Sequence, residues 1–467
     1  MSSKFQNPVS GTLSFDSEPY TTVNKPIDLS DPGRRHAPTY WAATAEQEMT
    51  TDGELVGDID VPVAVIGGGF TGLSTAYHLA RNYGVKAAVL EANRVGWGAT
   101  GRNGGFAMIC VGKEEYTEML SRFTPEVARQ QFGVGLDAVE TVKDVISQNN
   151  LEVDRAEEGW LSVAHKPSAM KGLEETAKVL KNGFGYSTEL IGRDEVKRRY
   201  VGSTEVYGGI VLPDGFGLHP LKYAQGIARA AMNHGAKIHT SSPVVSWTKR
   251  NGRHVLSTPK GTVTADHVVI GTGGYTLDTL NPWLSGRILP AMSNIIVTRP
   301  LTTDEQRQAG FLSTIMTSDT RRLVFYYRLL PDGRFLIGAR AGLRDEKSQN
   351  EQAFAWLTSR MGDMFPSLRN VKIDYFWRGW LCLSRDQNPH VGTTEDPTVH
   401  YGIAYMGNGV ALASHFGKLI AGRIGGQKRL PDIEFFRTPL PKFELPALRE
   451  LSLRAAYKVY GVKDRLC

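Results

Sequence analysis

At 467 residues, with 41% hydrophobic and 22% charged residues, the chain has the composition of an ordinary globular protein with room for two or three domains. Its net charge of +6 is mild and its 54 basic residues are dispersed, so the basic footprint of a nucleic-acid-binding protein is absent. Three distant cysteines, Cys110, Cys382 and Cys467, argue against a structural zinc site or a redox-active dithiol pair. We therefore expect no metal and a reducing, cytoplasmic location. We also expect neither a membrane span nor a signal peptide, because the sequence has no apolar run of about 18 residues and no apolar core near its start.

Residues 1–57 are rich in Pro, Ser, Thr, Asp and Gly and show no hydrophobic periodicity. Such a segment buries too little apolar surface to fold by itself. We predict an N-terminal arm that lies on the surface and whose first part is disordered.

A dinucleotide-binding unit is predicted over residues 58–112. An apolar run at residues 61–66 is followed by Gly67, Gly69 and Gly72, which have the G-x-G-x-x-G spacing. The first glycine permits a tight turn, the second lets a pyrophosphate approach the backbone, and the third lets the next helix lie close on the sheet. The N-terminus of that helix offers free amides and a positive dipole end to the phosphates.

An acid and a glycine-rich loop complete this unit. A second apolar run ends at Glu91, whose carboxylate is placed to accept hydrogen bonds from an adenosine ribose. The loop at residues 96–105 leaves the carboxyl end of the same strand, where parallel sheets bind ligands. Three of its side chains, Thr100, Arg102 and Asn103, can donate hydrogen bonds to phosphate.

Helical and strand-like patterns alternate over the rest of the chain. Helical spacing covers residues 124–148, 221–235 and 410–424. Strand-like runs cover residues 159–164, 206–212, 268–270, 295–298, 323–328 and 334–338. The last two runs flank Pro-Asp-Gly at residues 331–333, which is a hairpin signal. Because the later strands lack helical crossovers, they predict an antiparallel sheet distinct from the parallel one.

The first glycine turn fits NAD and FAD equally well. Two more glycine-rich turns, at residues 271–274 and 407–409, should reach the same crevice, because one ends an apolar strand and the other opens an apolar helix. A helix N-terminus there would stabilise the negative charge of a reduced flavin. These turns favour FAD, and an NAD(P)-dependent Rossmann dehydrogenase stays open as the alternative.

Seven motifs in this order carry a resemblance to a known family. They lie at residues 40–44, 65–73, 96–105, 217–220, 269–275, 377–392 and 407–410. Together they resemble the D-amino-acid-oxidase-like (glycine/sarcosine oxidase) superfamily of FAD-dependent amine oxidoreductases, and within it the bacterial γ-glutamylputrescine oxidases. The resemblance implies an α/β fold, in which a Rossmann-like FAD-binding domain is interwoven with an α+β substrate domain built on an antiparallel β-sheet.

The resemblance also implies a set of FAD-binding residues. Those expected around the pyrophosphate and the adenosine are Gly67, Gly69, Phe70, Thr71, Gly72, Glu91 and, through its backbone, Val244. Those expected along the phosphates and the flavin are Ala99, Thr100, Arg102, Asn103, Gly104, Gly105, Gly271, Thr272 and Gly273. Those expected at the flavin pyrimidine edge are Gly407, Asn408, Gly409 and Val410.

The sequence departs from the family pattern at three positions. Gly379 stands where some relatives link FAD to a cysteine, and Cys382 does not match that position, so we expect non-covalent FAD. Leu336 is the nearest match to a lysine that activates oxygen in related oxidases, and Arg299 stands where relatives often have an acid. These departures leave the exact substrate and the electron acceptor, O2 or another molecule, open.

We divide the chain into four parts on this basis. The N-terminal arm covers residues 1–57, and the C-terminal tail covers residues 431–467. The discontinuous FAD-binding domain takes residues 58–150, 216–285 and 376–430. The substrate domain takes residues 151–215 and 286–375.

Flavin amine oxidation needs few protein groups beyond those that position the amine and keep the site dry. We expect hydride transfer from a small amine to flavin N5, followed by hydrolysis of the imine, and we assign no catalytic side chain. Candidates for the substrate pocket are Asn294, Tyr326, Tyr327, Arg328 and Arg340. Either of the two arginines could bind a substrate carboxylate bidentately.

The predicted substrate is an amine or an N-substituted amino acid, with γ-glutamylputrescine as the best single guess. A flavoprotein of RNA modification is a further alternative, which the mild charge disfavours.

Overall fold

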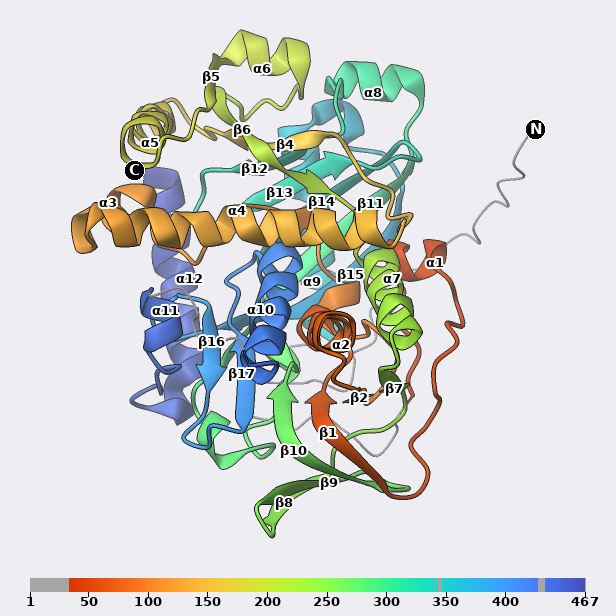
Figure 1. Ribbon diagram of the computed structural model, residues 1–467. Coiled ribbons are helices and arrows are strands. Elements are labelled where there is room, and N and C mark those ends of the chain that lie inside the picture. The colour runs from red at the N-terminus through yellow and green to blue at the C-terminus, as the bar shows by residue number, and fades with distance from the viewer. Residues whose placement is uncertain (1–32, 341, 343–346, 427–432, 467) are drawn as a thin grey trace.

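The computed structural model describes residues 33–340, 342, 347–426 and 433–466, and all structural statements concern these residues. Two β-sheets dominate the fold (Figure 1), one in the lower half of the view and a larger one in the upper half. The long helix α4 (Pro125–Gln148) runs across between them. The α/β fold that the sequence predicts is the fold observed.

The eight-stranded sheet has a parallel centre. Its main path runs in the order β16 (His390–Thr393), β17 (Val399–Ile403), β10 (Thr262–Ile270), β1 (Ile59–Ile66), β2 (Ala87–Leu90) and β7 (Lys237–His239). The antiparallel pair β8 (Ser246–Arg250) and β9 (Arg253–Ser257) extends from β10. Ile66 at the end of β1 pairs with Ile270 and with Leu90, so three strands end at one edge. The glycine turns that follow Ile66 and Ile270 therefore meet there, as the crevice rule for parallel sheets requires.

Three helices pack against one another beside this sheet, namely α2 (Phe70–Tyr83), α7 (Pro220–Asn233) and α10 (Gly409–Ile424). Helix α2 is buried from Phe70 to Ala80, and its C-cap is Gly84, which has a φ of +63°. Helices α2 and α10 touch closely, because a Cβ at Gly417 would lie 2.7 Å from the Thr71 carbonyl oxygen. This contact holds the middle of α10 against the start of α2.

The nine-stranded sheet is antiparallel except for one pair. Its path is β15 (Ile373–Leu383), β11 (Leu289–Pro300), β14 (Arg334–Arg340), β13 (Phe325–Leu329), β12 (Met316–Asp319), β4 (Glu158–Val163), β6 (Gly208–Gly217) and β3 (Phe106–Ala107), with β5 (Glu189–Gly192) also on β6. The exception is β12, which pairs in parallel with β4. Parallel neighbours require a long crossover, and here the chain passes through the other sheet before it returns. The predicted antiparallel sheet is thus correct in all but this pair.

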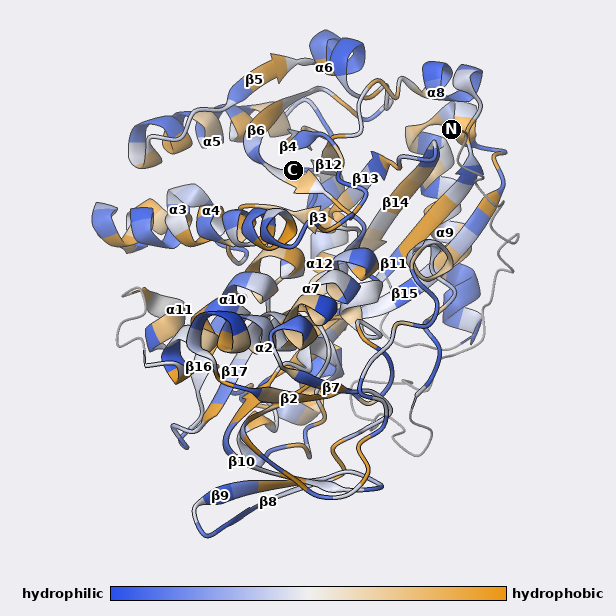
Figure 2. Cartoon of the chain, turned by 45° about the vertical axis from the view of Figure 1, so that its right-hand side comes forward, coloured by the Kyte–Doolittle hydropathy of each residue, from blue (hydrophilic) through white to orange (hydrophobic). Residues whose placement is uncertain are grey.

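Other helices of the described chain lie around the two sheets. They are α3 (Tyr116–Arg122), α5 (Ala169–Phe184), α6 (Arg193–Arg199), α8 (Thr303–Ala309), α9 (Lys347–Met364), α11 (Glu434–Arg437) and α12 (Arg449–Leu466). Figure 2 shows the contrast in hydropathy between the two kinds of element: β11 and β14 are largely hydrophobic, whereas α6 and α8 at the surface are largely hydrophilic. The apolar residues of the central strands form the core.

The end of the N-terminal arm differs from the prediction of a surface segment. Residues 1–32 lie outside the described part of the chain, but Tyr40–Thr44 form the short helix α1. Its Tyr40 and Trp41 side chains are 5% and 1% exposed, and they pack with Ile295 and Val297 of β11. The arm therefore ends inside the fold, because its two aromatic side chains find a tertiary partner that periodicity does not reveal.

The strands of the two sheets do not follow the predicted domain boundaries at every point, and the domain division stays a prediction. Strand β15 pairs with β11 along most of its length, so a boundary at residue 376 runs through one strand of the nine-stranded sheet. Strand β3 likewise joins that sheet through β6, although it falls within residues 58–150. The chain crosses between the sheets more often than the division assumes.

Candidate cofactor and substrate site

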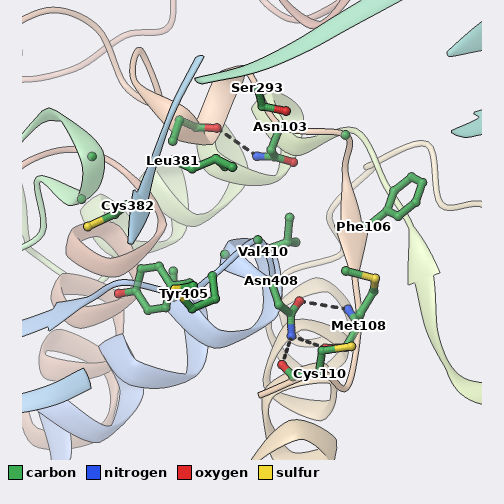
Figure 3. A pocket seen from close by; sticks show the side chains of 18 of the residues that line it. Asn103, Phe106, Met108, Cys110, Ser293, Leu381, Cys382, Tyr405, Asn408 and Val410 are labelled. Carbon is green, nitrogen blue, oxygen red and sulfur yellow. Dashed lines mark hydrogen bonds between the residues drawn. The ribbon is translucent and has the colours of Figure 1, made fainter. Parts of the chain in front are cut away.

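A cavity of about 740 Å³ lies between the two sheets. Its lining comes from the carboxyl edge of the parallel sheet, from the loop at residues 96–105, from the start of α10 and from the nine-stranded sheet. Figure 3 shows part of it, with Asn103 and Ser293 on one side and Tyr405 and Asn408 on the other. The predicted glycine turns and the predicted substrate sheet thus face one space.

The first glycine turn forms one end of this cavity. Gly67 and Gly69 line it, whereas Gly72 lies behind the turn, inside α2. A Cβ at Gly72 would lie 2.0 Å from the carbonyl oxygen of Gly67, so the close approach of helix and turn leaves no room for a side chain. Gly69 is the N-cap of α2 and has no side-chain cap, which leaves amides at the helix start for a ligand.

The carboxylate of Glu91 lines the cavity beside this turn. It accepts hydrogen bonds from the backbone N–H of Gly68 at 2.7 Å and of Asn93 at 2.9 Å. Burial raises the pKa of Glu91, while the two backbone donors lower it. A carboxylate so fixed has oxygen lone pairs left for further donors, which is the property that a ribose-binding acid needs.

The loop at residues 96–105 is held by its own side chains. Thr100 Oγ1 accepts a hydrogen bond from the Phe70 N–H at 3.1 Å, at the start of α2. Asn103 Nδ2 donates to the carbonyl oxygens of Ala99 and Thr100 at 3.2 and 2.8 Å, and Asn103 Oδ1 accepts from the Gly105 N–H at 2.7 Å. The sequence predicts these side chains as phosphate donors, whereas in the structure they shape the loop.

Arg102 also turns back on the loop. Its guanidinium carbon lies 4.4 Å from the centre of the Trp97 ring, and its Nε donates to the Trp97 carbonyl oxygen at 3.2 Å. The side chain is buried, and its stem lies over Gly379, where a Cβ would come within 3.0 Å of the Arg102 Cβ. Arg102 therefore lines the cavity with a side chain that packs against the ring of Trp97.

Two tryptophans fix the backbone of this loop from behind. The indole N–H of Trp41 donates to the carbonyl oxygen of Asn103 at 2.8 Å, and that of Trp377 donates to the carbonyl oxygen of Arg102 at 2.9 Å. The two rings contact each other with their centres 6.3 Å apart. The sequence did not predict this arrangement, since residue 41 falls in the predicted arm and Trp377 stands in a motif of the resemblance without an assigned role.

The start of α10 forms the next wall, and Asn408 is its key side chain. Asn408 Nδ2 donates to the carbonyl oxygens of Met108 and Cys110 at 2.6 and 2.7 Å, and its Oδ1 accepts from the Met108 N–H at 3.3 Å (Figure 3). The side chain therefore ties the segment after β3 to the helix and does not cap α10. The helix N-terminus remains directed at the cavity, with Gly407, Gly409 and Val410 in the lining.

The nine-stranded sheet supplies the opposite wall. Ser293, Tyr326 and Arg340 line the cavity, and Ser293 Oγ lies 2.9 Å from the hydroxyl oxygen of Tyr326. Ser293 pairs with Arg340 across β11 and β14, and Tyr326 pairs with Gly338 across β13 and β14. Side chains of directly paired residues point to the same face of a sheet, so these residues share the cavity face.

Three other substrate-pocket candidates do not line the cavity. Asn294 and Tyr327 are neighbours of Ser293 and Tyr326 in sequence, so the pleat turns them to the other face. Asn294 accepts a hydrogen bond from Arg378 Nε at 2.7 Å, and Tyr327 lies in the core with its ring 5.6 Å from that of Phe365. The prediction therefore named both faces of β13, of which only that of Tyr326 lines the cavity, and on β11 it named Asn294 in place of its neighbour Ser293.

Arg328 is the third substrate-pocket candidate that does not line the cavity. It is only 3% exposed and lies 5.6 Å from the Trp41 ring centre and 5.9 Å from that of Phe106, with Nη2 donating to the Leu218 carbonyl oxygen at 2.6 Å. Its Nε and Nη1 are buried without a hydrogen-bond partner in the described chain. Burial lowers the pKa of Arg328 to about 10. This arginine supports the sheet behind the loop and leaves Arg340 as the candidate for a substrate anion.

Arg340 shares its end of the cavity with Lys113, which sequence reasoning missed. Arg340 Nη2 donates to the Met406 carbonyl oxygen at 2.9 Å, and both cations line the cavity. The pKa of Lys113 is lowered to about 7, mainly by the neighbouring guanidinium of Arg340, and burial contributes less because the residue is exposed. Within the described chain, no carboxylate forms an ion pair with either side chain. Two positive charges at one end of a cavity, neither ion-paired with a carboxylate of the described residues, favour an anionic group there.

Most of the predicted FAD-binding residues line the cavity. The exceptions are Gly72 and Gly105. Lining residues that were not predicted include Trp97, Phe106, Met108, Lys113, Tyr275 and Tyr405. Most of these are aromatic or apolar, and no motif distinguishes them from ordinary core residues.

Neither a metal centre nor a helix that could cross a bilayer is found in the described chain. No three His, Cys, Asp or Glu side chains in it gather as the ligands of a metal ion do. None of its helices combines the length and the apolar composition that crossing a bilayer requires.

A known family matches most of the chain. The model of the DAO family, described as FAD dependent oxidoreductase, matches residues 62–423. These residues include both glycine turns of the parallel sheet, the loop at 96–105 and the start of α10.

Curated relatives match along nearly their whole length. The chain is 32% identical to the probable oxidoreductase OrdL of Haemophilus influenzae over 408 residues, which is 86% of this chain and 92% of that protein. It is 31% identical to the gamma-glutamylputrescine oxidoreductase of Escherichia coli over 440 residues, which is 92% of this chain and 99% of that protein. A glycine oxidase of Bacillus licheniformis is 26% identical over 374 residues, or 78% of this chain and 92% of that protein.

Solved structures share the fold. Glycine oxidase from Geobacillus kaustophilus superposes with a TM-score of 0.67 at 18% identity, over 82% of this chain and 99% of that chain. L-proline dehydrogenase from P. horikoshii superposes with a TM-score of 0.64 at 21% identity, over 81% of this chain and 96% of that chain. At these identities the likeness concerns the architecture alone.

Proposed function

The chain belongs to the DAO family of FAD-dependent oxidoreductases, and we propose that it oxidises an amine that carries a carboxylate, with γ-glutamylputrescine as the first candidate substrate. The family acts on amines or amino acids with FAD as cofactor, which removes the NAD(P)-dependent dehydrogenase considered from the sequence. The observation that carries the finer proposal is the pair of cations, Lys113 and Arg340, at one end of the cavity.

The residues of the cavity fit FAD. Gly69 lines the cavity at the start of α2, and a Cβ there would already lie 3.0 Å from Thr100 Oγ1, so the turn is open to a phosphate only because it has no side chain. Glu91 stands beside it as the acid for the adenosine ribose, and the N-terminus of α10 stands at the other end for the flavin. We assign the pyrophosphate to the Gly67 turn and the flavin pyrimidine edge to residues 407–410.

When bound, FAD would supply the hydride acceptor that oxidation of an amine to an imine requires, and water would then hydrolyse the imine. The protein's part is to hold the amine in line and to keep water out. Tyr326, Phe106 and Met108 give this part of the cavity an apolar wall. Burial raises the pKa of Tyr326 to about 12, so its hydroxyl stays protonated and acts as a hydrogen-bond group at neutral pH.

The cationic end defines which amines fit. γ-Glutamylputrescine carries a free carboxylate at its glutamyl end and a primary amine at its other end, so one molecule can place an anion on Arg340 and an amine on the flavin. Putrescine itself lacks the anion. Charge-assisted hydrogen bonds from guanidinium to carboxylate are about twice as strong as neutral ones, so a carboxylate should dominate selection.

We propose that FAD is held without a covalent bond. Cys110 and Cys382 both line the cavity, although Cys382 does not match the position at which some relatives link FAD to a cysteine. Burial raises the pKa of both thiols to about 12, so neither is a thiolate at neutral pH. Acid precipitation should release the flavin into the supernatant, and flavin retained in the pellet would contradict this assignment.

The substrate class is tested by one arginine variant and two matched substrates. Arg340→Met should lower kcat/KM for γ-glutamylputrescine about 10- to 100-fold, the range for a lost hydrogen bond to a charged group. The methyl ester of the same substrate lacks the carboxylate charge and should be affected little. Equal losses with both substrates would contradict the assignment of Arg340 to the anion.

A further inference from the structure

Exposed large apolar side chains gather near the C-terminal end of the chain. Among the described residues, ten large hydrophobic side chains are exposed, and five of them lie between residues 445 and 462. The five are Leu445, Leu448, Leu451, Val459 and Val462, with exposed fractions of 65%, 48%, 60%, 50% and 54%. Single apolar residues are ordinary on a protein surface, whereas a cluster marks an interaction site.

Four of these side chains follow one side of helix α12 and of the turn η5 (Pro446–Leu448) that leads into it. With the exposed Ala455 they recur at intervals of three or four residues, and at about 100° per residue they stay within an arc of roughly 80°. We call Leu448, Leu451, Ala455, Val459 and Val462 the outer stripe.

The opposite side of α12 is fixed to the body of the protein. Leu453 is buried against Leu289 and Leu383 of the nine-stranded sheet. Near the end of the helix, the Asp464 carboxylate accepts hydrogen bonds from the N–H groups of Arg322 and Leu323, at 2.8 and 3.1 Å.

The start of the helix is fixed as well. The buried Arg449 guanidinium donates to the Ile288 carbonyl oxygen at 2.5 Å and to the Asp278 carboxylate at 2.7 Å. A helix anchored at both ends cannot turn its outer stripe inward. The stripe therefore faces outward as a built feature of the fold.

Basic side chains flank the outer stripe. Lys458 lies on one side of it and Lys463 on the other, and both are exposed, as is Arg322 on the adjoining turn. The nearby acids are engaged: Glu450 pairs with Arg454 at 2.6 Å, and Asp464 accepts the backbone bonds described above. An apolar stripe between exposed cations is complementary to a surface that is apolar beneath and anionic above.

We propose that the outer stripe of α12 docks the protein on an anionic lipid surface, with the apolar side chains entering the headgroup boundary and the lysines meeting the lipid phosphates. This is peripheral binding and concerns a face outside the cofactor cavity, so it holds whatever the substrate.

Two other occupants fit less well. A second copy would have to meet the same patch in a symmetric pair, which would bring the lysines of one copy against those of the other. A separate protein partner needs about 800 Å² on each side for a stable interface, and one convex helix with five aliphatic side chains is narrow for that. A lipid surface deforms around a single helix and needs no partner groove.

The proposal is tested by co-sedimentation of the flavin-loaded, full-length protein with lipid vesicles. Wild-type protein should bind vesicles that contain phosphatidylglycerol, should bind pure phosphatidylcholine vesicles weakly, and should lose affinity as salt is added. The triple variant Leu451→Gln, Val459→Gln, Val462→Gln should lose binding at least tenfold. Lys458→Gln and Lys463→Gln should each lower affinity about fivefold, as one basic contact fewer predicts.

The control variant is Leu312→Gln, since Leu312 is 57% exposed and lies outside the C-terminal cluster. It should bind vesicles as wild type does, and all variants should keep the wild-type melting temperature and flavin content. Equal binding by wild type and the triple variant would overturn the proposal. So would a dimer in sedimentation velocity without lipid that the triple variant abolishes, because the stripe would then be an interface between copies.

Discussion

The glycines of the first turn meet different obstacles, and a matched series separates them. Gly72→Ala would place a methyl group 2.0 Å from the Gly67 carbonyl oxygen and 2.9 Å from Val65 Cγ1, so we expect loss of the folded state. Gly69→Ala would meet only Thr100 Oγ1 at 3.0 Å and would point into the cavity, so the fold should survive while FAD affinity falls. Urea unfolding and FAD titration measure the two effects.

Gly133→Ala is the control in this series. Gly133 lies within α4, and a Cβ at this position would have open space around it, so the variant should gain up to about 1 kcal/mol from helix propensity. Its FAD affinity should match wild type. If Gly69→Ala binds FAD as tightly as Gly133→Ala, the phosphates do not sit at this turn.

Lys113 gives the anion site a pH dependence with a definite sign. Its pKa is lowered to about 7, so without ligand it is charged below pH 7 and neutral above. γ-Glutamylbutylamide keeps the glutamyl carboxylate but lacks the terminal amine, so it should inhibit competitively and best below pH 7. Its inhibition constant should rise by up to tenfold for each pH unit above that value, until only Arg340 remains as cation.

Two lysine variants decide whether this titration belongs to Lys113. Lys113→Arg keeps its charge at every accessible pH, so the inhibition constant should be low and should not change with pH. Lys113→Gln carries no charge, so the inhibition constant should be high and should also not change with pH. A wild-type profile retained in both variants would assign the titration to another group.

At the scale of elements, helix α1 is the support that most directly links stability to the cofactor loop. Trp41→Phe keeps a ring but removes the indole bond to the Asn103 carbonyl oxygen, at an expected cost of about 1–2 kcal/mol. Trp41→Ala also leaves a cavity and should cost about 3–5 kcal/mol. Because the loop backbone loses its support, FAD affinity should fall in the same order. Unfolding and FAD titration of the two variants check this, and unchanged FAD affinity in Trp41→Ala would contradict the link.

The same elements show how far the sequence predicts the site. The glycine turn, the acid at Glu91 and the start of α10 were predicted because each is set by local rules for turns and helix starts. Helix α1 was missed because five residues carry no periodicity, and its burial depends on β11. Asn294 was placed on the wrong face because β11 is buried on both faces, so its run from Leu289 to Thr298 shows no polar alternation that reveals the pleat.

At the scale of the whole molecule, the cavity exists because the chain passes repeatedly between the two sheets. The end of β1 and the end of β10 supply one wall, and β11, β13 and β14 supply the other, from segments far apart in sequence. Arg340 and Lys113 come together only in this arrangement, and neither stands in a motif of its own. Long-range pairing of this kind is not encoded in any local pattern, which explains why the cofactor end was predicted better than the substrate end.

The decisive experiment on the proposed function is an anaerobic titration of the purified protein with γ-glutamylputrescine, followed through the flavin absorbance at about 450 nm. We predict that one equivalent of substrate bleaches one equivalent of bound FAD and yields one equivalent each of aldehyde and ammonia, while putrescine bleaches it far more slowly. A protein that cannot be loaded with FAD would contradict the assignment of the cavity. Bound FAD that putrescine reduces as fast as γ-glutamylputrescine would contradict the carboxylate-bearing substrate.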